Sequence, residues 1–163
     1  MKTLLLIRHA KSSWNEPVLT DFDRPLNERG KKDAPEMAKR IKEKIAIELF
    51  VSSPAKRAKK TAKIFAEEFG VDKNEIVLVE DLYGATEEAF AEAVASLKDK
   101  NDVVAIFSHN PGITEFANSL TATRVDDMPT CAVFALQCET DTWKNFAEAE
   151  KKFLFFDYPK NEF

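Results

Sequence analysis

Short apolar runs alternate with segments of helical periodicity along most of the chain. Four runs of strand length cover residues 4–7, 47–51, 76–79 and 103–107. Between them, apolar residues recur every three to four positions, as on the buried face of an amphipathic helix. Strands that are apolar throughout are typical of a parallel sheet that is covered on both faces. The pattern therefore predicts a three-layer α/β/α sandwich with a mostly parallel sheet.

A polar residue able to cap a helix precedes each predicted helix. These residues are Asn27, Ser53 and Thr86. A side-chain oxygen at such a position accepts a hydrogen bond from the first helical turn. Pro54 at the first helical position and Gly70 after the last turn define the second helix. Pro35 removes a hydrogen bond from the first helix, so we expect a kink near residues 31–35 or a second start capped by Asp33.

The pattern changes in the C-terminal part of the chain. Residues 130–137 are mostly apolar on both faces, which indicates a further buried strand. Residues 139–142 predict a hairpin turn, and the alternation over 143–148 predicts an edge strand paired antiparallel with the strand before it. The aromatic run at 153–159 is expected to dock on the body of the domain. We therefore expect one domain over residues 1–163, with an antiparallel strand element late in the chain.

Composition and charge argue against several classes of function. The net charge of −4 argues against general nucleic-acid binding. Four apolar residues separate Thr3 from Arg8, too few for a signal peptide, and no apolar stretch is long enough to span a membrane. Cys131 and Cys138 match no metal-ligand or redox spacing and are expected to be free thiols. These features predict a cytoplasmic protein without nucleic-acid or membrane partners.

Both histidines of the chain directly follow a predicted strand. Arg8 and His9 come after the first strand, and Ser108 and His109 come after the fourth. The carboxyl ends of parallel strands meet at one edge of a sheet, where ligands bind. A cationic and a nucleophilic side chain at that edge predict a site that processes an anion. The alternative is a pair of ordinary surface residues, but two unrelated histidines would seldom share this placement.

Further polar groups are expected near the same edge. Arg57 lies in the first turn of the second helix, where its guanidinium and the positive helix end can face an anion. Alternatively, Arg57 belongs to a solvated basic face with its lysine neighbours. These neighbours are Lys56, Lys59, Lys60 and Lys63. Ser12 and Asn15 follow His9 closely and carry short hydrogen-bonding groups, whereas Trp14 is expected to be a packing anchor.

Four segments resemble the motifs of the histidine phosphatase superfamily, which also contains the cofactor-dependent phosphoglycerate mutases. Residues 8–15 match the pattern Arg-His-Gly-x-Ser-x-x-Asn, except that Ala10 replaces the glycine. Residues 25–30 resemble the Pro-Leu-x-x-x-Gly segment, residues 52–62 the Ser-x-x-x-Arg-Ala-x-x-Thr-Ala segment, and residues 108–111 the second histidine motif. The compact chain and its Ser-His-x-Pro motif look most like the SixA-type phosphohistidine phosphatases.

The resemblance implies a role for each matching residue. His9 corresponds to the nucleophile that becomes phosphorylated. The implied phosphate-binding residues are Arg8, Ser12, Asn15, Arg57 and His109. Glu80 matches the acid of a Glu-x-x-Tyr-Gly segment at residues 80–84, with its neighbour Asp81 as the alternative. No metal ion or other cofactor is expected, because arginines can neutralise the phosphate.

The resemblance therefore implies a phosphatase that works through a covalent phosphohistidine. Its expected partner is a phosphorylated protein, carrying phosphohistidine, or a small phosphomonoester. Phosphohistidine leaves as an imidazole, which takes up a proton readily, whereas an alkoxide leaving group requires an acid. Two alternatives remain open: a mutase of the phosphoglycerate type, which the compact chain disfavours, and a non-catalytic module that binds phosphate.

Overall fold

A six-stranded sheet forms the centre of the computed structural model, which describes residues 1–14 and 19–161. The strand order is β3-β2-β4-β1-β5-β6. The strands are β1 (Lys2–Arg8), β2 (Leu49–Ser52), β3 (Val77–Leu78), β4 (Val103–Ser108), β5 (Val133–Cys138) and β6 (Lys151–Asp157). Strands β1 to β4 pair in parallel, whereas β5 is antiparallel to both of its neighbours. The predicted mostly parallel sheet with a late antiparallel element is confirmed.

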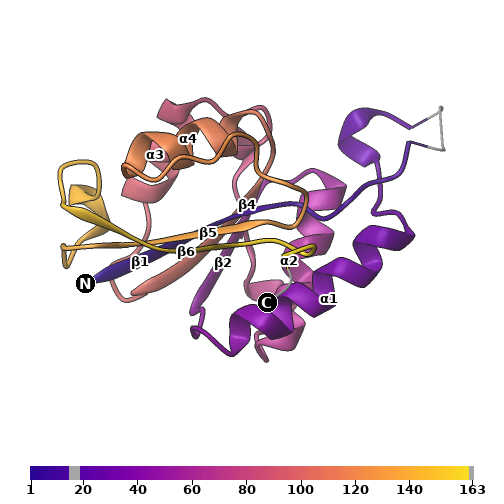
Figure 1. The fold of residues 1–163 in the computed structure, drawn as a ribbon, viewed down its shortest axis with the longest axis horizontal. Coiled ribbons are helices and arrows are strands. Elements are labelled where there is room, and N and C mark those ends of the chain that lie inside the picture. The colour runs from indigo at the N-terminus through magenta and orange to yellow at the C-terminus, as the bar shows by residue number, and fades with distance from the viewer. Residues whose placement is uncertain (15–18, 162–163) are drawn as a thin grey trace.

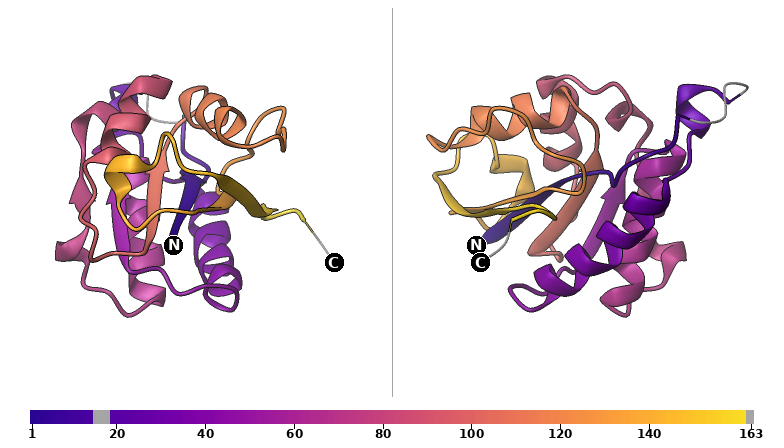
Figure 2. Two further views of the ribbon diagram at one scale, coloured as in Figure 1. Left: turned by 90° about the vertical axis from the view of Figure 1, so that its left-hand side faces the viewer. Right: turned by 45° about the vertical axis from the view of Figure 1, so that its right-hand side comes forward.

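Four helices cover the two faces of the sheet. They are α1 (Glu28–Lys42), α2 (Lys56–Glu68), α3 (Glu87–Ala95) and α4 (Gly112–Leu120). Figure 1 shows α3 and α4 above the sheet and α1 and α2 below it. The second view in Figure 2 shows the same two layers on opposite sides of the strands. Helix α4 is not predicted from the sequence, although Ile113, Phe116 and Ala117 have the spacing of a buried helical face.

The central strand β1 is apolar throughout because it contributes to two hydrophobic cores. Leu4 and Leu6 belong to the cluster that contains buried residues of α3 and α4. Leu5 and Ile7 belong to the cluster that contains buried residues of α1 and α2. Successive side chains of a strand point to opposite faces, so a fully apolar run results when both faces are covered. Leu4 to Ile7 are accordingly all fully buried.

Two of the three predicted helix caps are confirmed, and one is wrong. Asn27 and Thr86 accept hydrogen bonds from the first turns of α1 and α3. Ser53 does not cap α2, which begins at Lys56 with Ala55 in the capping position. The Ser53 hydroxyl instead contacts the ring of His109 and accepts from the backbone N–H of Ala55, and the chain bends at residues 54–55 before the helix begins.

The expected second start of α1 at Asp33 is also wrong. Helix α1 continues through Pro35 from Glu28 to Lys42. The Asp33 carboxylate is buried and accepts from Arg29 Nε at 3.1 Å, one helical turn earlier, so it is engaged within the helix and does not cap a new one. Gly30 lies in the first turn of α1 directly against the backbone of Lys11, where a Cβ would clash. The helix therefore supports the loop that follows β1.

The predicted edge strand at 143–148 is wrong, because the partner of β5 is β6, within the aromatic run. Residues 143–145 form a 3₁₀ turn that buries Trp143 completely. Its indole Nε1 donates to the carbonyl of Asn101 at 2.7 Å, which anchors the connection before β6. Phe153 and Phe156 pack on one core, and Leu154 and Phe155 pack on the other. The aromatic run is therefore a two-sided strand.

The expectation of free cysteines is confirmed in the described residues. Cys131 and Cys138 are free and buried. Among residues 1–14 and 19–161, no helix has the length and apolar character needed to cross a membrane.

Candidate active site

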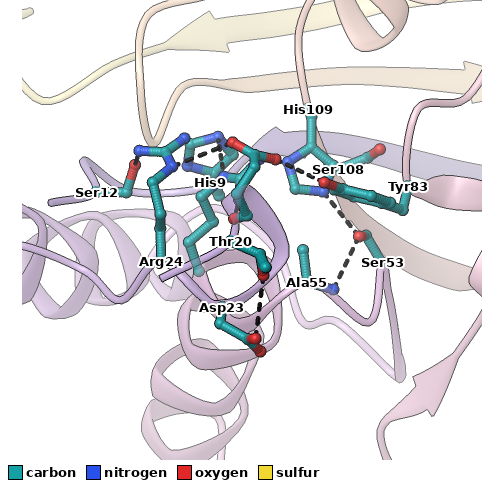
Figure 3. Close-up of polar contacts among 12 residues, drawn as sticks. His9, Ser12, Thr20, Asp23, Arg24, Ser53, Ala55, Tyr83, Ser108 and His109 are labelled. Carbon is teal, nitrogen blue, oxygen red and sulfur yellow. Dashed lines mark hydrogen bonds and ion pairs between the residues drawn. The ribbon is translucent and has the colours of Figure 1, made fainter. Parts of the chain in front are cut away.

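Two loops at the carboxyl edge of the sheet, after β1 and β4, bring both histidines together. Strand β1 is flanked by β4, with Arg8 paired to Ser108, and the residues that follow are His9 and His109. Their ring centroids lie 5.1 Å apart. Figure 3 shows His9 and His109 facing the same space, with Ser53 below His109. Arg57, in the first turn of α2, completes the group. The predicted convergence on one edge is therefore present.

A cavity of about 590 Å³ opens above His9. Its lining includes five predicted site residues, which are Arg8, His9, Ser12, Arg57 and His109. A second cavity of about 530 Å³ adjoins it and shares Asp21, Arg57 and His109 with it. Asp21, Arg57 and His109 therefore lie between the two adjoining cavities, and His9 lines the first of them.

The hydrogen bonds of His9 define which ring nitrogen can react. Nδ1 lies 2.7 Å from the carbonyl oxygen of Ala10, which can only accept, so Nδ1 carries the ring hydrogen. Nε2 therefore holds a lone pair, and it accepts from Arg57 Nε at 3.3 Å. The ring is oriented with its nucleophilic nitrogen toward the guanidinium.

His9 is neutral at physiological pH. Burial is the largest cause that lowers its pKa, the hydrogen bond to Ala10 opposes it, and the nearby His109, Arg57 and Arg8 add to it, so that the pKa falls from the usual 6.5 to about 3. Burial also lowers the pKa of His109 to about 3, and the charge of Arg57 acts in the same direction. A neutral imidazole keeps the lone pair that nucleophilic attack requires.

The free energy of unfolding is expected to fall as the pH falls from 6.5 toward 3. In that range the unfolded histidines bind protons and the folded ones do not, so acid favours the unfolded state. Each histidine contributes a slope of about 1.4 kcal/mol per pH unit where it is fully neutral in the fold. Denaturant unfolding of the wild type and of His109→Asn, between about pH 7 and about pH 4.5, measures this slope. The variant should depend less steeply on pH, and parallel curves would contradict a buried neutral His109.

Ser53 fixes the orientation of His109. Its Oγ lies 2.7 Å from His109 Nε2 and already accepts from the Ala55 backbone N–H at 3.2 Å. The arrangement is satisfied when the hydroxyl donates to Nε2, which places the ring hydrogen of His109 on Nδ1. Nδ1 is buried and has no hydrogen-bond partner among the described residues. The serine therefore holds an unpaired N–H donor at the cavity.

Ser53→Ala is expected to lower kcat/KM for phosphorylated imidazole about tenfold, which is the equivalent of one lost hydrogen bond. Without the hydroxyl, the ring hydrogen of His109 is no longer held on Nδ1, so the pH profile of kcat/KM should change as well. Ser52→Ala is the matched control, since Ser52 is equally buried but donates to the Ser53 carbonyl. Steady-state rates and unfolding midpoints of both variants separate the two roles. Equal losses in the two variants would assign Ser53 a purely structural role.

The arginines supply further donors to the cavity. Arg57 is buried and donates through Nη1 to the backbone carbonyl of Asp21 at 2.6 Å and through Nη2 to its carboxylate at 3.0 Å. Arg57 is therefore not part of the solvated lysine face. Arg8 donates through Nη1 to the carbonyl of Met128 at 2.8 Å, while its buried Nε has no partner in the described chain. Arg8 and His109, the two residues with an unpaired buried nitrogen among those described, thus line the same cavity. An anion bound there would satisfy both groups.

Asp21 is a site residue that the sequence interpretation missed. Its carboxylate accepts from Arg57, from Arg24 Nε at 3.1 Å and from the Tyr83 hydroxyl at 2.7 Å. Partial burial raises its pKa, but these hydrogen bonds and the charge of Arg57 outweigh that effect and hold the pKa at about 2. Asp21 is therefore ionised and orients two arginines. Tyr83 belongs to the Glu-x-x-Tyr-Gly segment, which was a usable signal for part of this cluster.

The remaining predicted residues occupy different places. Ser12 lines the cavity, but its hydroxyl accepts from Arg24 Nη1 at 2.6 Å. Glu80 is exposed at the start of a 3₁₀ turn (Glu80–Leu82) and is not among the residues that line either cavity. Its neighbour Asp81 lines a separate groove beside α3. Asn15 lies outside the described residues.

Trp14 and Ala10 lie close to His9 in the sequence, and Trp14 does not have its predicted role. Trp14 is 76% exposed and stacks on the Arg24 guanidinium at 3.4 Å, so it is not the packing anchor that was predicted. The Trp14 ring therefore packs against the guanidinium of Arg24 and not against a hydrophobic core. Ala10, which replaces the motif glycine, is fully buried, and its backbone N–H donates to the hydroxyl of Thr61 at 3.0 Å. The extra methyl group lies within a hydrophobic cluster.

The sheet order and the antiparallel end of the sheet define a phosphoglycerate mutase-like fold. Residues 4–85 match the sequence profile of the histidine phosphatase superfamily (branch 1), and the chain belongs to this family.

Comparisons with individual proteins agree with this assignment. An uncharacterised chloroplast protein of Arabidopsis thaliana is 28% identical over 152 residues, which cover 88% of this chain and 69% of that protein. A structure assigned as the phosphohistidine phosphatase SixA of Agrobacterium tumefaciens is 25% identical, with a TM-score of 0.81 over 97% of this chain and 98% of that one. The protein histidine phosphatase SixA complexed with tungstate has the same TM-score at 18% identity, over 96% of this chain and 97% of that one, and shares the fold.

Proposed function

We propose that this protein is a phosphatase that transfers a phosphoryl group to Nε2 of His9 and then to water, with phosphohistidine in proteins as its substrate. The observation that carries the proposal is the geometry of His9. Its lone pair is on Nε2, which accepts from Arg57 Nε, and the same cavity is lined by Arg8 and His109, each of which has a buried nitrogen without a partner among the described residues. This combination suits attack on a phosphorus atom whose oxygens are held by fixed positive groups.

In the first step, Nε2 attacks phosphorus while the bond from phosphorus to the substrate nitrogen breaks. The departing imidazole nitrogen takes a proton from solvent. Arg57 Nε, which donates to Nε2 in the free protein, is the donor nearest to the forming bond and shifts to a phosphoryl oxygen. Arg8 Nε and His109 Nδ1 hold further oxygens. Three donors then surround the charge that spreads over the phosphoryl group.

In the second step, water attacks phosphorus and the bond to His9 breaks. The electron pair returns to Nε2, inorganic phosphate leaves, and the proton that water loses replaces the one consumed in the first step. The Ala10 carbonyl holds the Nδ1 hydrogen throughout, so the ring stays oriented in the phosphorylated state. The arginine charges neutralise the phosphate, and no step requires a metal ion or another cofactor.

The carboxylates near the cavities favour a leaving group that needs no acid. Among the described lining residues, these carboxylates are Asp21 and Glu115. Asp21, with its pKa of about 2, has no proton to give. Glu115 is exposed on α4 and lines the second cavity, not the one at His9. An imidazole leaves without such an acid more readily than an alkoxide, which supports phosphohistidine over a phosphomonoester.

The covalent intermediate is the direct test. The enzyme is mixed with phosphorylated imidazole, quenched in base or in acid, and digested for mass spectrometry. We expect phosphate on the peptide that contains His9 after the base quench but not after the acid quench, because phosphoramidates are lost in acid. Turnover without this adduct would exclude the mechanism. Transfer of the phosphate to an added alcohol in place of water would favour a mutase, and binding of phosphate without turnover would favour a non-catalytic module.

A further inference from the structure

A groove of about 420 Å³ beside the active site is lined by lysines. The five lysines among the described residues of this groove are Lys31, Lys56, Lys59, Lys60 and Lys63. Phe22 and Pro54 contribute apolar surface to the same groove, and Asp23 is its acidic residue. The whole chain has a net charge of −4, so this concentration of positive charge is local.

The lysines of α2 are not neutralised by the protein. The side chains of Lys56, Lys59, Lys60 and Lys63 form no ion pair or hydrogen bond with the residues that the structure describes. The fifth, Lys31, pairs with Glu28 at 3.6 Å, and both side chains are exposed. The positive charge of the groove is therefore open to a partner.

This charge distribution is unfavourable for the helix itself. The lysines of α2 recur at spacings of three and four residues, so they share one face and repel one another. They occupy the N-terminal part of α2, whose first turn has no acidic residue, although the positive end of a helix favours negative side chains. A local arrangement that costs stability without an internal compensation indicates a function in binding.

The groove adjoins the active-site cavity through neighbouring residues of the chain. Phe22 lines the groove, and Asp21 lines the cavity. Lys56 lines the groove, and Arg57 reaches into the cavity. Seven helical steps from Lys56 to Lys63 span about 10 Å, the length of about three extended residues. A chain that places its phosphorylated residue on His9 can therefore lay its next few residues along the lysines.

We propose that this groove binds an acidic segment that flanks the phosphohistidine of the substrate protein. The inference rests on the proposed function, because it assumes that the phosphoryl group is delivered by a polypeptide. Carboxylates of the segment would face the lysine side chains, and an apolar residue would contact Phe22 and Pro54. Because such pairs are partly exposed, they contribute to substrate capture more than to the chemical step.

Three synthetic peptides test the proposal. Each contains one phosphohistidine, flanked by four Glu, four Gln or four Lys residues, and phosphorylated imidazole serves as the substrate without flanks. We expect kcat/KM for the Glu peptide to exceed that for the Gln peptide about tenfold at low salt, with the Lys peptide slowest. The difference should reside mainly in KM and should shrink as the ionic strength rises.

The variant Lys56→Glu/Lys60→Glu should remove the preference for the Glu peptide and leave turnover of phosphorylated imidazole unchanged. Lys98→Glu/Lys100→Glu makes the same change of charge with two exposed lysines that precede β4, at the opposite edge of the sheet from His109, and should keep the preference. Equal rates for the three peptides, or equal effects of the two double variants, would overturn the groove proposal while phosphorylated imidazole still reports the activity. A wild type that hydrolyses neither the peptides nor phosphorylated imidazole would overturn both proposals.

Discussion

His9→Ala is expected to lower turnover of phosphorylated imidazole on the order of 10⁴-fold or more, because the variant has no atom to carry the phosphoryl group. The His9 ring bonds to the Ala10 carbonyl and to Arg57, so its loss leaves the core packing intact. Inorganic phosphate should still bind, since Arg8, Arg57 and His109 remain. The measurements are steady-state turnover, titration with phosphate and the base-quenched adduct.

Added imidazole provides a sharp control for this variant. His9 is only 5% exposed, so its removal leaves a buried space of the shape of the missing ring. Free imidazole that fills this space should restore part of the turnover. The neutral imidazole should be the active species, because it has the lone pair that attack on phosphorus requires. Wild-type rates in His9→Ala without imidazole would exclude His9 as the nucleophile.

Arg57→Ala is expected to lower kcat/KM by about 10²- to 10³-fold, the typical effect of removing one charged donor from a transition state. Arg57 is the residue that contacts both His9 Nε2 and the Asp21 carboxylate, so its loss also leaves Asp21 without one of its cations. In the proposed mechanism Arg57 serves both substrate binding and the chemical step, so kcat should fall and KM should rise. Steady-state kinetics and the inhibition constant of inorganic phosphate measure this effect.

Two further variants separate charge from geometry at this position. Arg57→Lys keeps the charge but cannot contact His9 and Asp21 in the same fork, so it should recover little of the lost rate. Lys60→Ala removes an exposed charge from the same helix and should leave the turnover of phosphorylated imidazole unchanged. If Arg57→Ala behaved like Lys60→Ala, Arg57 would have no part in the reaction.

The strand ends could be predicted from the sequence because their signal is local. Each histidine directly follows a run of apolar residues, and parallel strands must bring such positions to one edge. The sequence left the role of Arg57 open between an anion site and a solvated face. Arg57 is buried and donates to Asp21, which excludes the solvated face. Neither its burial nor this contact can be predicted from the charge pattern of α2.

The contacts that orient the site could not be predicted, because they join distant segments. Tyr83 and Asp21 are 62 positions apart in the chain, and Ser53 and His109 are 56 apart. Ser53 precedes a proline at the start of a helical pattern, as helix caps often do, but its hydroxyl contacts His109, which follows β4. The predicted edge strand at 143–148 is wrong for a similar reason, since the burial of Trp143 in a 3₁₀ turn overrides the regular alternation there.

The central position of β1 has a consequence for how the enzyme loses its activity on heating. His9 follows a strand that is hydrogen-bonded on both sides, to β4 and to β5, and Leu4 to Ile7 have no exposed surface. Such a segment exchanges its amide hydrogens only when the whole molecule opens. Asp21 belongs to a short 3₁₀ turn that has no buried residue, which can open by itself. We therefore expect the turn that contains Asp21, which orients Arg24 and Arg57, to open at a lower temperature than the strand that positions His9.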